Sequence, residues 1–167
     1  MTTQKVDSFY FHSGMRDYVL PLRHADPART PWNPLSKPLE ECSVTLISSA
    51  GIHLKGDIPF DLDRERREPT WGDPSYREIP SSAGQDDVEY THMHIATDYL
   101  EKDRNVAWPV DRFLEFEREG KIGRMTSTLY SIYGYVPNFH LLLKQTAPKI
   151  VSRLKEEGVD AAFLFPV

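Results

Sequence analysis

Short apolar runs alternate with segments of helical period along most of this chain. Residues 43–49 form a β-rich, nearly continuous apolar run, the pattern of a strand that is buried on both faces. Residues 161–165 repeat this pattern, residues 124–131 are predicted to form a further strand, and residues 88–94 alternate only weakly. Strands that alternate with helices favour a mostly parallel sheet.

Two segments have the period of an amphipathic helix. Residues 109–119 begin at Pro109, which suits a first helical turn, and Gly120 follows as a natural C-terminal stop. Residues 138–157 carry apolar side chains at helical spacing, and Pro148 is expected to kink this helix or to split it in two. The order of elements predicts an α/β fold, with a mostly parallel, Rossmann- or flavodoxin-like sheet flanked by helices.

Polar segments divide the chain. Residues 1–41 contain five prolines and few periodic signals, so we expect an extended N-terminal arm ahead of a single α/β domain at residues 42–167. Residues 56–87 are rich in Asp, Arg, Pro, Gly and Ser, and they are predicted to form a long, irregular surface excursion. Open sheets of this kind bind ligands beyond the carboxyl ends of their strands, which is where we expect a site.

Composition narrows the classes of function. The chain has 167 residues, 40% of them hydrophobic, which suits one domain with its own core. A net charge of −5 without a basic patch argues against nucleic acid or an anionic membrane as the main partner. No apolar run approaches the roughly 20 residues that span a bilayer, and the first ten residues contain no signal core. We therefore expect a cytoplasmic protein.

A series of short motifs resembles one protein family. The segment from Ser49 to Asp57 (SAGIHLKGD) resembles the first strand-turn motif of the selenocysteine subunit of D-proline reductase, and more loosely selenoprotein B of glycine, sarcosine and betaine reductases. Further matches follow in the same order: Arg77-Glu-Ile-Pro80, His92, Lys102-Asp103, Asn105, Pro109-Val-Asp111-Arg112, Ser131-Ile-Tyr-Gly134 and Leu154-Lys-Glu-Glu-Gly158-Val-Asp160. The ordered series, rather than any one tetrapeptide, carries the resemblance.

The resemblance implies a subunit of an amino-acid reductase. In that family a selenolate attacks a small amino-acid substrate and cleaves a carbon–heteroatom bond, while a partner subunit with a pyruvoyl group activates the substrate. Selenocysteine follows the strand after Gly-Val-Asp, so alignment on Gly158-Val-Asp160 would place it immediately after Val167. We therefore expect a domain truncated before its C-terminal part, with no cofactor in this chain and no activity of this chain alone.

The motif match also selects candidate site residues. His53 and His92 are the candidate catalytic residues, because imidazole with a pKa near 6.5 can orient a carboxylate or shuttle a proton. The alternative for His53 is a loop histidine bonded to backbone, and for Lys55 a solvated ammonium. The candidate substrate-binding residues are Ser48, Ser49, Gly51, Lys55 and Ser131.

Two other hypotheses stay open. On a strand, His92 and His94 would face the same side, and with His53 they would resemble a zinc or iron site, although the resemblance implies no metal. The chain is otherwise a non-catalytic α/β binding or assembly module, completed by another chain or by a homo-oligomer that covers its final strand. The lone Cys42 precedes a strand and is expected to be structural.

Overall fold

The computed structural model describes residues 33–167. The predicted N-terminal arm therefore lies outside the described residues as far as residue 32. Residues 33–41 lead through a short 3-10 helix, η3 (Leu39–Glu41), to Cys42, which is fully buried and donates its thiol hydrogen to the Pro38 carbonyl at 3.3 Å.

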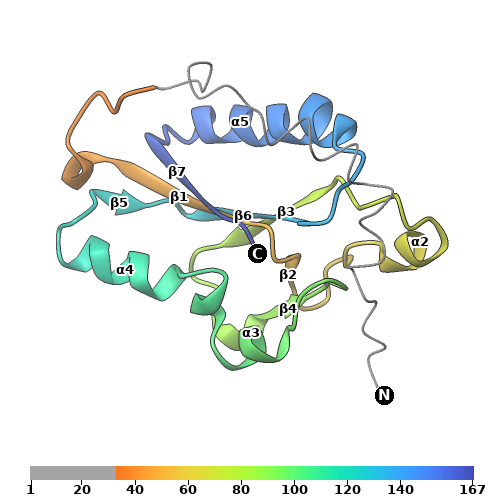
Figure 1. Ribbon diagram of the computed structural model, residues 1–167. Coiled ribbons are helices and arrows are strands. Elements are labelled where there is room, and N and C mark those ends of the chain that lie inside the picture. The colour runs from red at the N-terminus through yellow and green to blue at the C-terminus, as the bar shows by residue number, and fades with distance from the viewer. Residues whose placement is uncertain (1–32) are drawn as a thin grey trace.

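A mostly parallel sheet forms the centre of the molecule (Figure 1). Its strands are β1 (Ser43–Ser48), β3 (Tyr76–Pro80), β5 (Arg124–Met125), β6 (Thr128–Ile132) and β7 (Ala161–Phe165). Strand β1 pairs in parallel with β5, β6 and β7, whereas β3 pairs antiparallel with β6. Because Val44 has both Met125 and Ala161 as partners, β5 and β6 lie on one side of β1 and β7 lies on the other.

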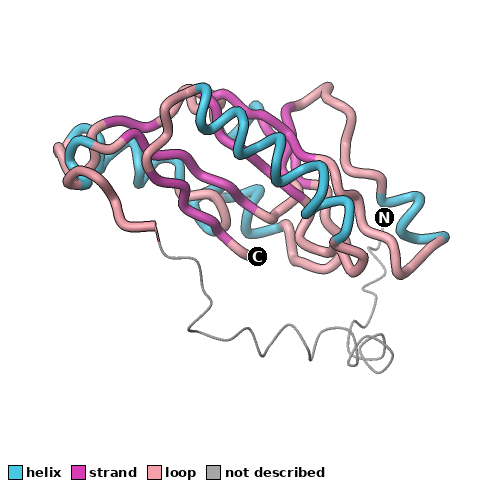
Figure 2. Tube along the Cα trace, turned by 90° about the horizontal axis from the view of Figure 1, so that it is seen from above, coloured by secondary structure: helices cyan, strands magenta, loops and turns pink. Residues whose placement is uncertain are grey.

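Helices cover both faces of this sheet (Figures 1 and 2). Helix α4 (Val110–Arg118) lies on one face and α5 (Ala147–Glu156) on the other. The remaining short helices are α2 (Leu62–Arg67), α3 (Asp98–Lys102), η4 (Gln85–Asp87) and η5 (Arg104–Val106). The expected fold class, an α/β domain with a mostly parallel sheet flanked by helices, is confirmed.

The apolar residues that predicted β1 and α4 are the ones that form the hydrophobic core. Val44 and Leu46 of β1 are fully buried, as their uninterrupted apolar run predicts. They belong to one hydrophobic cluster with Val110 and Phe113 of α4 and with the buried Trp108. The amphipathic pattern of residues 109–119 therefore marks the helix face that packs on the sheet. Over residues 33–167, no helix is long and apolar enough to cross a membrane.

Pro148 does not divide the second predicted helix. The backbone is helical from residue 140 to residue 156, with a π-turn, η6 (Leu142–Thr146), just before Pro148. The Ala147 N–H donates to the Leu142 carbonyl, five residues earlier. Proline has no N–H, and its ring collides with the carbonyl four residues earlier in a regular α-helix. The wider π-turn lets the helix continue through this residue.

The prediction of an irregular excursion at residues 56–87 is wrong. This segment contains α2, whose first turn is capped by the Asp61 carboxylate accepting from the Arg64 N–H at 2.9 Å. It also contains β3, of which only Ile79 is a buried apolar residue. Neither element has a local apolar period, so α2 depends on its Asp61 cap and β3 on its pairing with the distant strand β6.

A second, two-stranded sheet lies outside the main one. Strand β2 (Ile52–Leu54) pairs antiparallel with β4 (Val88–Tyr90). The predicted strand at residues 88–94 thus ends at Tyr90, and His92 and His94 lie in the loop that follows. Gly51 makes the turn from β1 into β2 at a φ of +65°, a conformation that favours glycine.

Candidate functional site

The carboxyl ends of three parallel strands meet at one edge of the main sheet. Ser49 follows β1, Gly134 follows β6, and Val167 follows β7. The Ser49 N–H donates to the Phe165 carbonyl at 3.1 Å, and the Val167 N–H donates to Ser49 Oγ at 2.9 Å. The expected ligand-binding edge therefore contains Ser49, one of the predicted substrate-binding residues.

Gly134 lies in close contact with Ser49 and His92. A Cβ atom built on this exposed glycine would lie 2.9 Å from the Ser49 carbonyl oxygen, 3.2 Å from Ser49 Oγ and 3.1 Å from His92 Nε2. A side chain would not fit between these atoms, so glycine at this position lets Ser49, His92 and residue 134 lie in close contact. We call this close contact of Ser49, His92 and Gly134 the Gly134 notch.

His92 presents a neutral N–H donor to this notch. Its Nδ1 accepts the backbone N–H of His94 at 3.1 Å, which leaves the ring proton on Nε2. His92 Nε2 is buried and has no hydrogen-bond partner among the described residues. Burial, and secondarily the charge of His94, lower the pKa of His92 to about 4. At neutral pH the imidazole can therefore donate one hydrogen bond to a carbonyl, carboxylate or other anion.

A buried carboxylate lies behind His92. Glu65 of α2 is 2% exposed. Its Oε1 lies 2.5 Å from His94 Nε2, and its Oε2 accepts from Tyr133 Oη at 2.5 Å. The Tyr133 ring packs against His92 with a centroid separation of 4.5 Å, and Tyr135 packs against His94 at 4.0 Å. Burial and the hydrogen bond to Glu65 raise the pKa of Tyr133, so its hydroxyl stays protonated.

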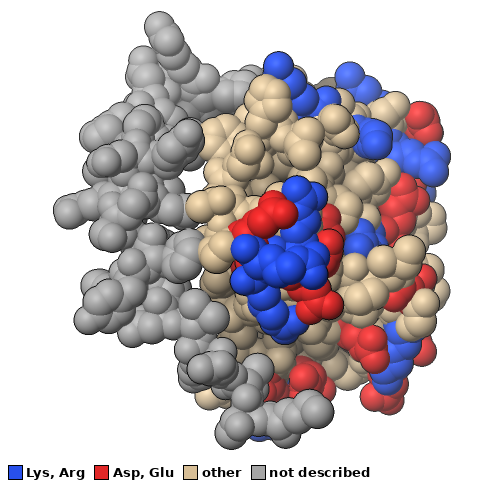
Figure 3. Space-filling view, turned by 90° about the vertical axis from the view of Figure 1, so that its right-hand side faces the viewer, with Lys and Arg blue, Asp and Glu red and all other residues tan. Residues whose placement is uncertain are grey.

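Glu65 is not among the residues that the sequence motifs select. The residue lies in a run of charged side chains, and its neighbours on α2 are exposed (Figure 3). Those neighbours form surface ion pairs, such as Arg64 with Glu68 and Arg66 with Asp63. Nothing in the sequence distinguishes Glu65 from them, because its burial depends on contacts with residues 94 and 133.

Three predicted substrate-binding residues have roles in the backbone framework. Ser48 Oγ donates to the Ala107 carbonyl at 2.9 Å, and Ser131 Oγ accepts the Ile52 N–H at 2.7 Å; both serines are fully buried. A Cβ on Gly51 would lie 2.2 Å from the Thr91 carbonyl oxygen. A substrate contact of Ser48, Gly51 or Ser131 stays a prediction.

His53 lies on β2 with both ring nitrogens engaged. Its Nδ1 donates to the Leu54 carbonyl at 3.0 Å, so its Nε2 accepts from Thr91 Oγ1 at 2.7 Å. His53 is 2% exposed. Its catalytic role stays a prediction, and its hydrogen bond to Thr91 gives it a contact with the residue just before His92.

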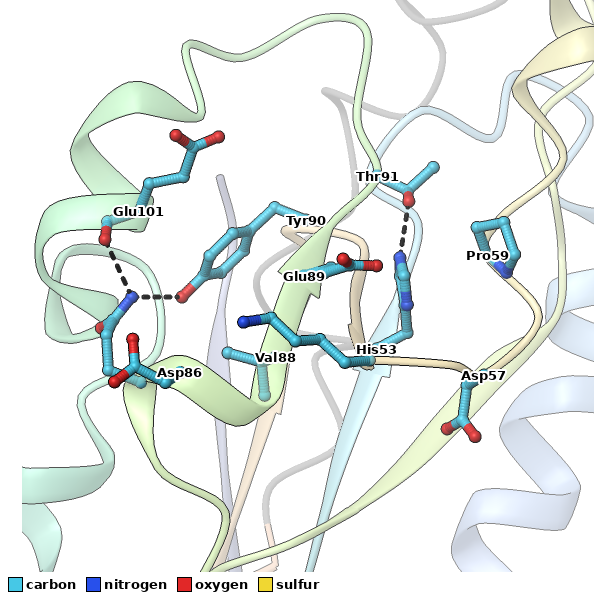
Figure 4. Close-up of a pocket in the computed structure, with 11 residues that line it drawn as sticks. His53, Asp57, Pro59, Asp86, Val88, Glu89, Tyr90, Thr91 and Glu101 are labelled. Atoms are coloured by element: carbon cyan, nitrogen blue, oxygen red, sulfur yellow. Dashed lines mark hydrogen bonds between the residues drawn. The ribbon is translucent and has the colours of Figure 1, made fainter.

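Lys55 lies beside a pocket of about 520 Å³ between the small sheet and η4 (Figure 4). The charged residues that line it are Lys55, Asp57, Asp86, Glu89 and Glu101. Four carboxylates and one ammonium give the pocket a negative character, which does not favour a substrate carboxylate. None of the three residues of the Gly134 notch lines this pocket.

The three histidines do not form a metal site. Within residues 33–167, no group of three or more His, Cys, Asp or Glu side chains is arranged to hold a metal ion. The strand that would have aligned His92 with His94 ends at Tyr90, and the two rings instead meet edge to face at 5.8 Å.

Comparison with known proteins adds to this geometry. The family model "Glycine/sarcosine/betaine reductase selenoprotein B (GRDB)" matches residues 14–166. The chain is 32% identical over 133 residues to D-proline reductase subunit gamma of Acetoanaerobium sticklandii, which covers 80% of this chain and 52% of that protein. It is 30% identical over 136 residues to glycine reductase complex component B subunit gamma of Carboxydothermus hydrogenoformans, which covers 81% of this chain and 30% of that protein. The chain thus spans about half the length of the first relative and less of the second. No solved structure matches the chain.

Proposed function

Because this chain belongs to the glycine/sarcosine/betaine reductase selenoprotein B family, we propose that it is a subunit, or part of a subunit, of an amino-acid reductase. The proposed reaction is reductive cleavage of a carbon–heteroatom bond in a small amino-acid substrate. The observation that carries this proposal is the Gly134 notch, in which three family-matched positions that are far apart in sequence meet at the carboxyl edge of the sheet.

We propose that the redox centre of the complete subunit directly follows β7. The hydrogen bond from the Val167 N–H to Ser49 Oγ supports this position, because Ser49 also borders the notch. When present, a selenolate there supplies the nucleophile of the reaction. Within the chain described, His92 Nε2–H would donate a hydrogen bond to an anionic or carbonyl oxygen of the bound substrate, and Ser49 Oγ would orient the same group.

The activity also needs a partner, in our proposal. The two relatives are named as subunits of D-proline reductase and of a glycine reductase complex. A second reductase subunit that activates the substrate would face the carboxyl edge, where Gly134 is exposed. This chain alone is then expected to be inactive.

The gene sequence beyond the codon for Val167 tests this proposal. A UGA codon followed by an open frame, with a cysteine codon within a few residues, would support it. A plain stop codon, or UGA with no open frame behind it, would remove the reductase chemistry from this chain.

A variant of the full-length protein tests the role of His92. In the assembled complex, His92→Phe is expected to lower kcat by about a hundredfold, because the substitution removes one preorganised donor. His140→Phe changes an exposed histidine and is the matched control. A His92→Phe complex with the wild-type kcat would contradict a role of this imidazole in catalysis.

The open edge of β7 favours a second candidate, an assembly module. Among the described strands, β7 pairs only with β1. Leu164 on this edge strand is 69% exposed and Phe163 is 39% exposed. An open edge with exposed apolar side chains readily pairs with another chain. We propose that a second copy or a partner subunit covers it.

Light scattering after size-exclusion chromatography tests the assembly module. We expect the wild-type chain to be an oligomer and Leu164→Lys to shift it toward the monomer. Ile58→Lys, at an 83% exposed loop position, is the control and should leave the mass unchanged. A wild-type chain that is monomeric both alone and with its partner subunit would contradict this candidate.

A further inference from the structure

The buried carboxylate of Glu65 has two acceptor oxygens and two donors. Tyr133 Oη donates to one oxygen, and the His94 Nε2–H faces the other, each at 2.5 Å. A carboxylate that is 2% exposed would be strongly destabilising without such partners. Hydrogen bonds to an ionised acceptor are about twice as strong as neutral ones. Glu65 therefore fixes the side chains of both donors.

Both donors are in contact with His92. The Tyr133 ring packs on the His92 ring, and Tyr133 Oη accepts the Met93 N–H at 3.4 Å. The His94 N–H donates to His92 Nδ1 at 3.1 Å. Glu65 is thus connected to residues 92–94 in two ways. One connection passes through Tyr133, and the other passes through His94.

We infer that Glu65 is a positioning residue, which holds residues 92–94 through Tyr133 and His94 and so keeps His92 Nε2–H directed at the Gly134 notch. The inference deepens the proposed function, because that function uses His92 as a donor. In this interpretation α2, which lies within residues 56–87, positions a side chain at the carboxyl edge of the sheet. The predicted effect of Glu65 is on the orientation and hydration of the His92 imidazole, and both can be measured in a protein that has no activity.

Substitution of Glu65 by glutamine separates this role from simple packing. Glutamine has nearly the same shape but offers one acceptor oxygen and one amide donor. Either Tyr133 or His94 would then face an amide N–H instead of an acceptor. Tyr133 Oη could accept this N–H, so the substitution replaces charge-assisted hydrogen bonds by weaker neutral ones. Glu68→Gln makes the same change at an exposed position of the same segment, beside Arg64, and is the matched control.

The test is a long-range proton–nitrogen NMR titration of the histidine rings in the full chain, with His92 assigned from a His92→Gln variant. In the wild type we expect one fixed tautomer, with the proton on Nε2, and a pKa of about 4. In Glu65→Gln we expect mixed tautomers and a rise of the His92 pKa by at least about one unit toward its ordinary value, because water reaches a loosened ring. The groups packed near His92 that also titrate are His94 and Tyr133, with Glu65 behind them and Tyr135 against His94.

Two results would overturn the inference. A folded Glu65→Gln protein whose His92 tautomer and titration match those of wild type and of Glu68→Gln shows that Glu65 does not position the ring. Should Glu65→Gln fail to fold, Tyr133→Phe keeps the aromatic ring and removes only the hydroxyl contacts. An unchanged His92 in folded Tyr133→Phe would equally count against the inference. Neither readout depends on reductase activity, so a failure of the proposed function remains distinguishable.

Discussion

Three buried side-chain polar atoms lack a hydrogen-bond partner within the described part of the chain: Ser43 Oγ, His92 Nε2 and Trp108 Nε1. Leaving such an atom unpaired costs about 1–3 kcal/mol. Ser43 begins β1, at the opposite end from the carboxyl edge, and Trp108 belongs to the hydrophobic core. His92 Nε2 lies against Ser49 and Gly134, just past the carboxyl ends of β1 and β6, so an acceptor that reached it would relieve this cost.

The positive φ of Gly51 and its close contact with Thr91 predict the stability cost of an alanine at this position. Gly51→Ala is expected to destabilise the fold by about 3 kcal/mol or more, because a left-handed alanine is strained and its Cβ would meet the Thr91 carbonyl oxygen at 2.2 Å. Gly56→Ala has a φ of +87° with no atom within 4 Å, so it should cost only about 1–2 kcal/mol. Urea unfolding of both variants measures the difference, and equal midpoints would contradict the steric argument.

Some residues of the candidate site could be predicted from the sequence. His92, Ser49 and the Gly134 turn were identifiable because they belong to short motifs that resemble a family, and the comparisons confirm that family. The sequence did not predict which of the two adjacent serines lies at the candidate site. Ser48 is buried against Ala107, whereas Ser49 contacts Val167. Adjacent residues of an extended chain point to opposite sides, and the side that forms the site depends on the packing partners. Glu65 was missed because burial of one carboxylate is a property of the tertiary fold.

An aromatic cluster joins α4 to the edge strand β7. The Phe113 ring lies 5.0 Å from that of Phe163 and 6.0 Å from that of Phe165, in edge-to-face arrangements. Phe116 contacts Phe113 from the same helix at 5.6 Å. Because β7 has a partner strand on one side only among the described residues, this cluster contributes a large part of what holds it in place.

Removal of Phe113 should therefore loosen β7 first. Phe113 is 6% exposed, and Phe113→Ala is expected to cost about 3–5 kcal/mol. Amide hydrogen exchange of residues 161–165 should accelerate more than that of residues 43–48. Phe116→Ala, at a partly exposed position, is the control and should cost clearly less. Uniform acceleration over both strands would mean that Phe113 stabilises the domain globally rather than β7.

Elements with strong local patterns were predictable and the others were not. Strand β1 and helix α4 lie within one or two residues of their predicted bounds, because their apolar periods match their burial. Helix α2 and strand β3 have mostly polar sequences, so their existence depends on Asp61 as a cap and on the ladder with β6. The π-turn before Pro148 arises from the same missing N–H that suggested a break.

At the scale of the whole molecule, the segment from residue 56 to residue 87 contributes both to the main sheet and to the candidate site. Its β3 forms one edge of the main sheet, while its α2 sends Glu65 toward the loop that follows β4. Global stability and the geometry of the notch therefore depend on the same segment. Protonation of His92 should therefore change the free energy of unfolding of the entire domain.

The free energy of unfolding is expected to fall as the pH is lowered from 7 to 5. The pKa of His92 is about 4 in the folded protein and near 6.5 when unfolded, so between these values the unfolded chain binds the extra proton. Stability contributed by the neutral ring is complete above pH 6.5 and declines toward pH 4, by about 2 kcal/mol at pH 5. Urea unfolding at both pH values measures this decline.

His92→Gln should remove that part of the pH dependence, whereas His140→Gln, at an exposed position, should retain it. An identical decline in wild type and His92→Gln would show that other groups cause it.

The burial of Cys42 has a practical consequence for studying such assemblies. Its thiol is fully enclosed and is the sole sulfhydryl in the sequence. Alkylating reagents react with accessible thiolates, so the native chain should be inert toward maleimide. Within these 167 residues, a cysteine introduced at Leu164 or Glu68 would then be the only accessible thiol for a spin label or fluorophore, and distances from it to a partner subunit become measurable.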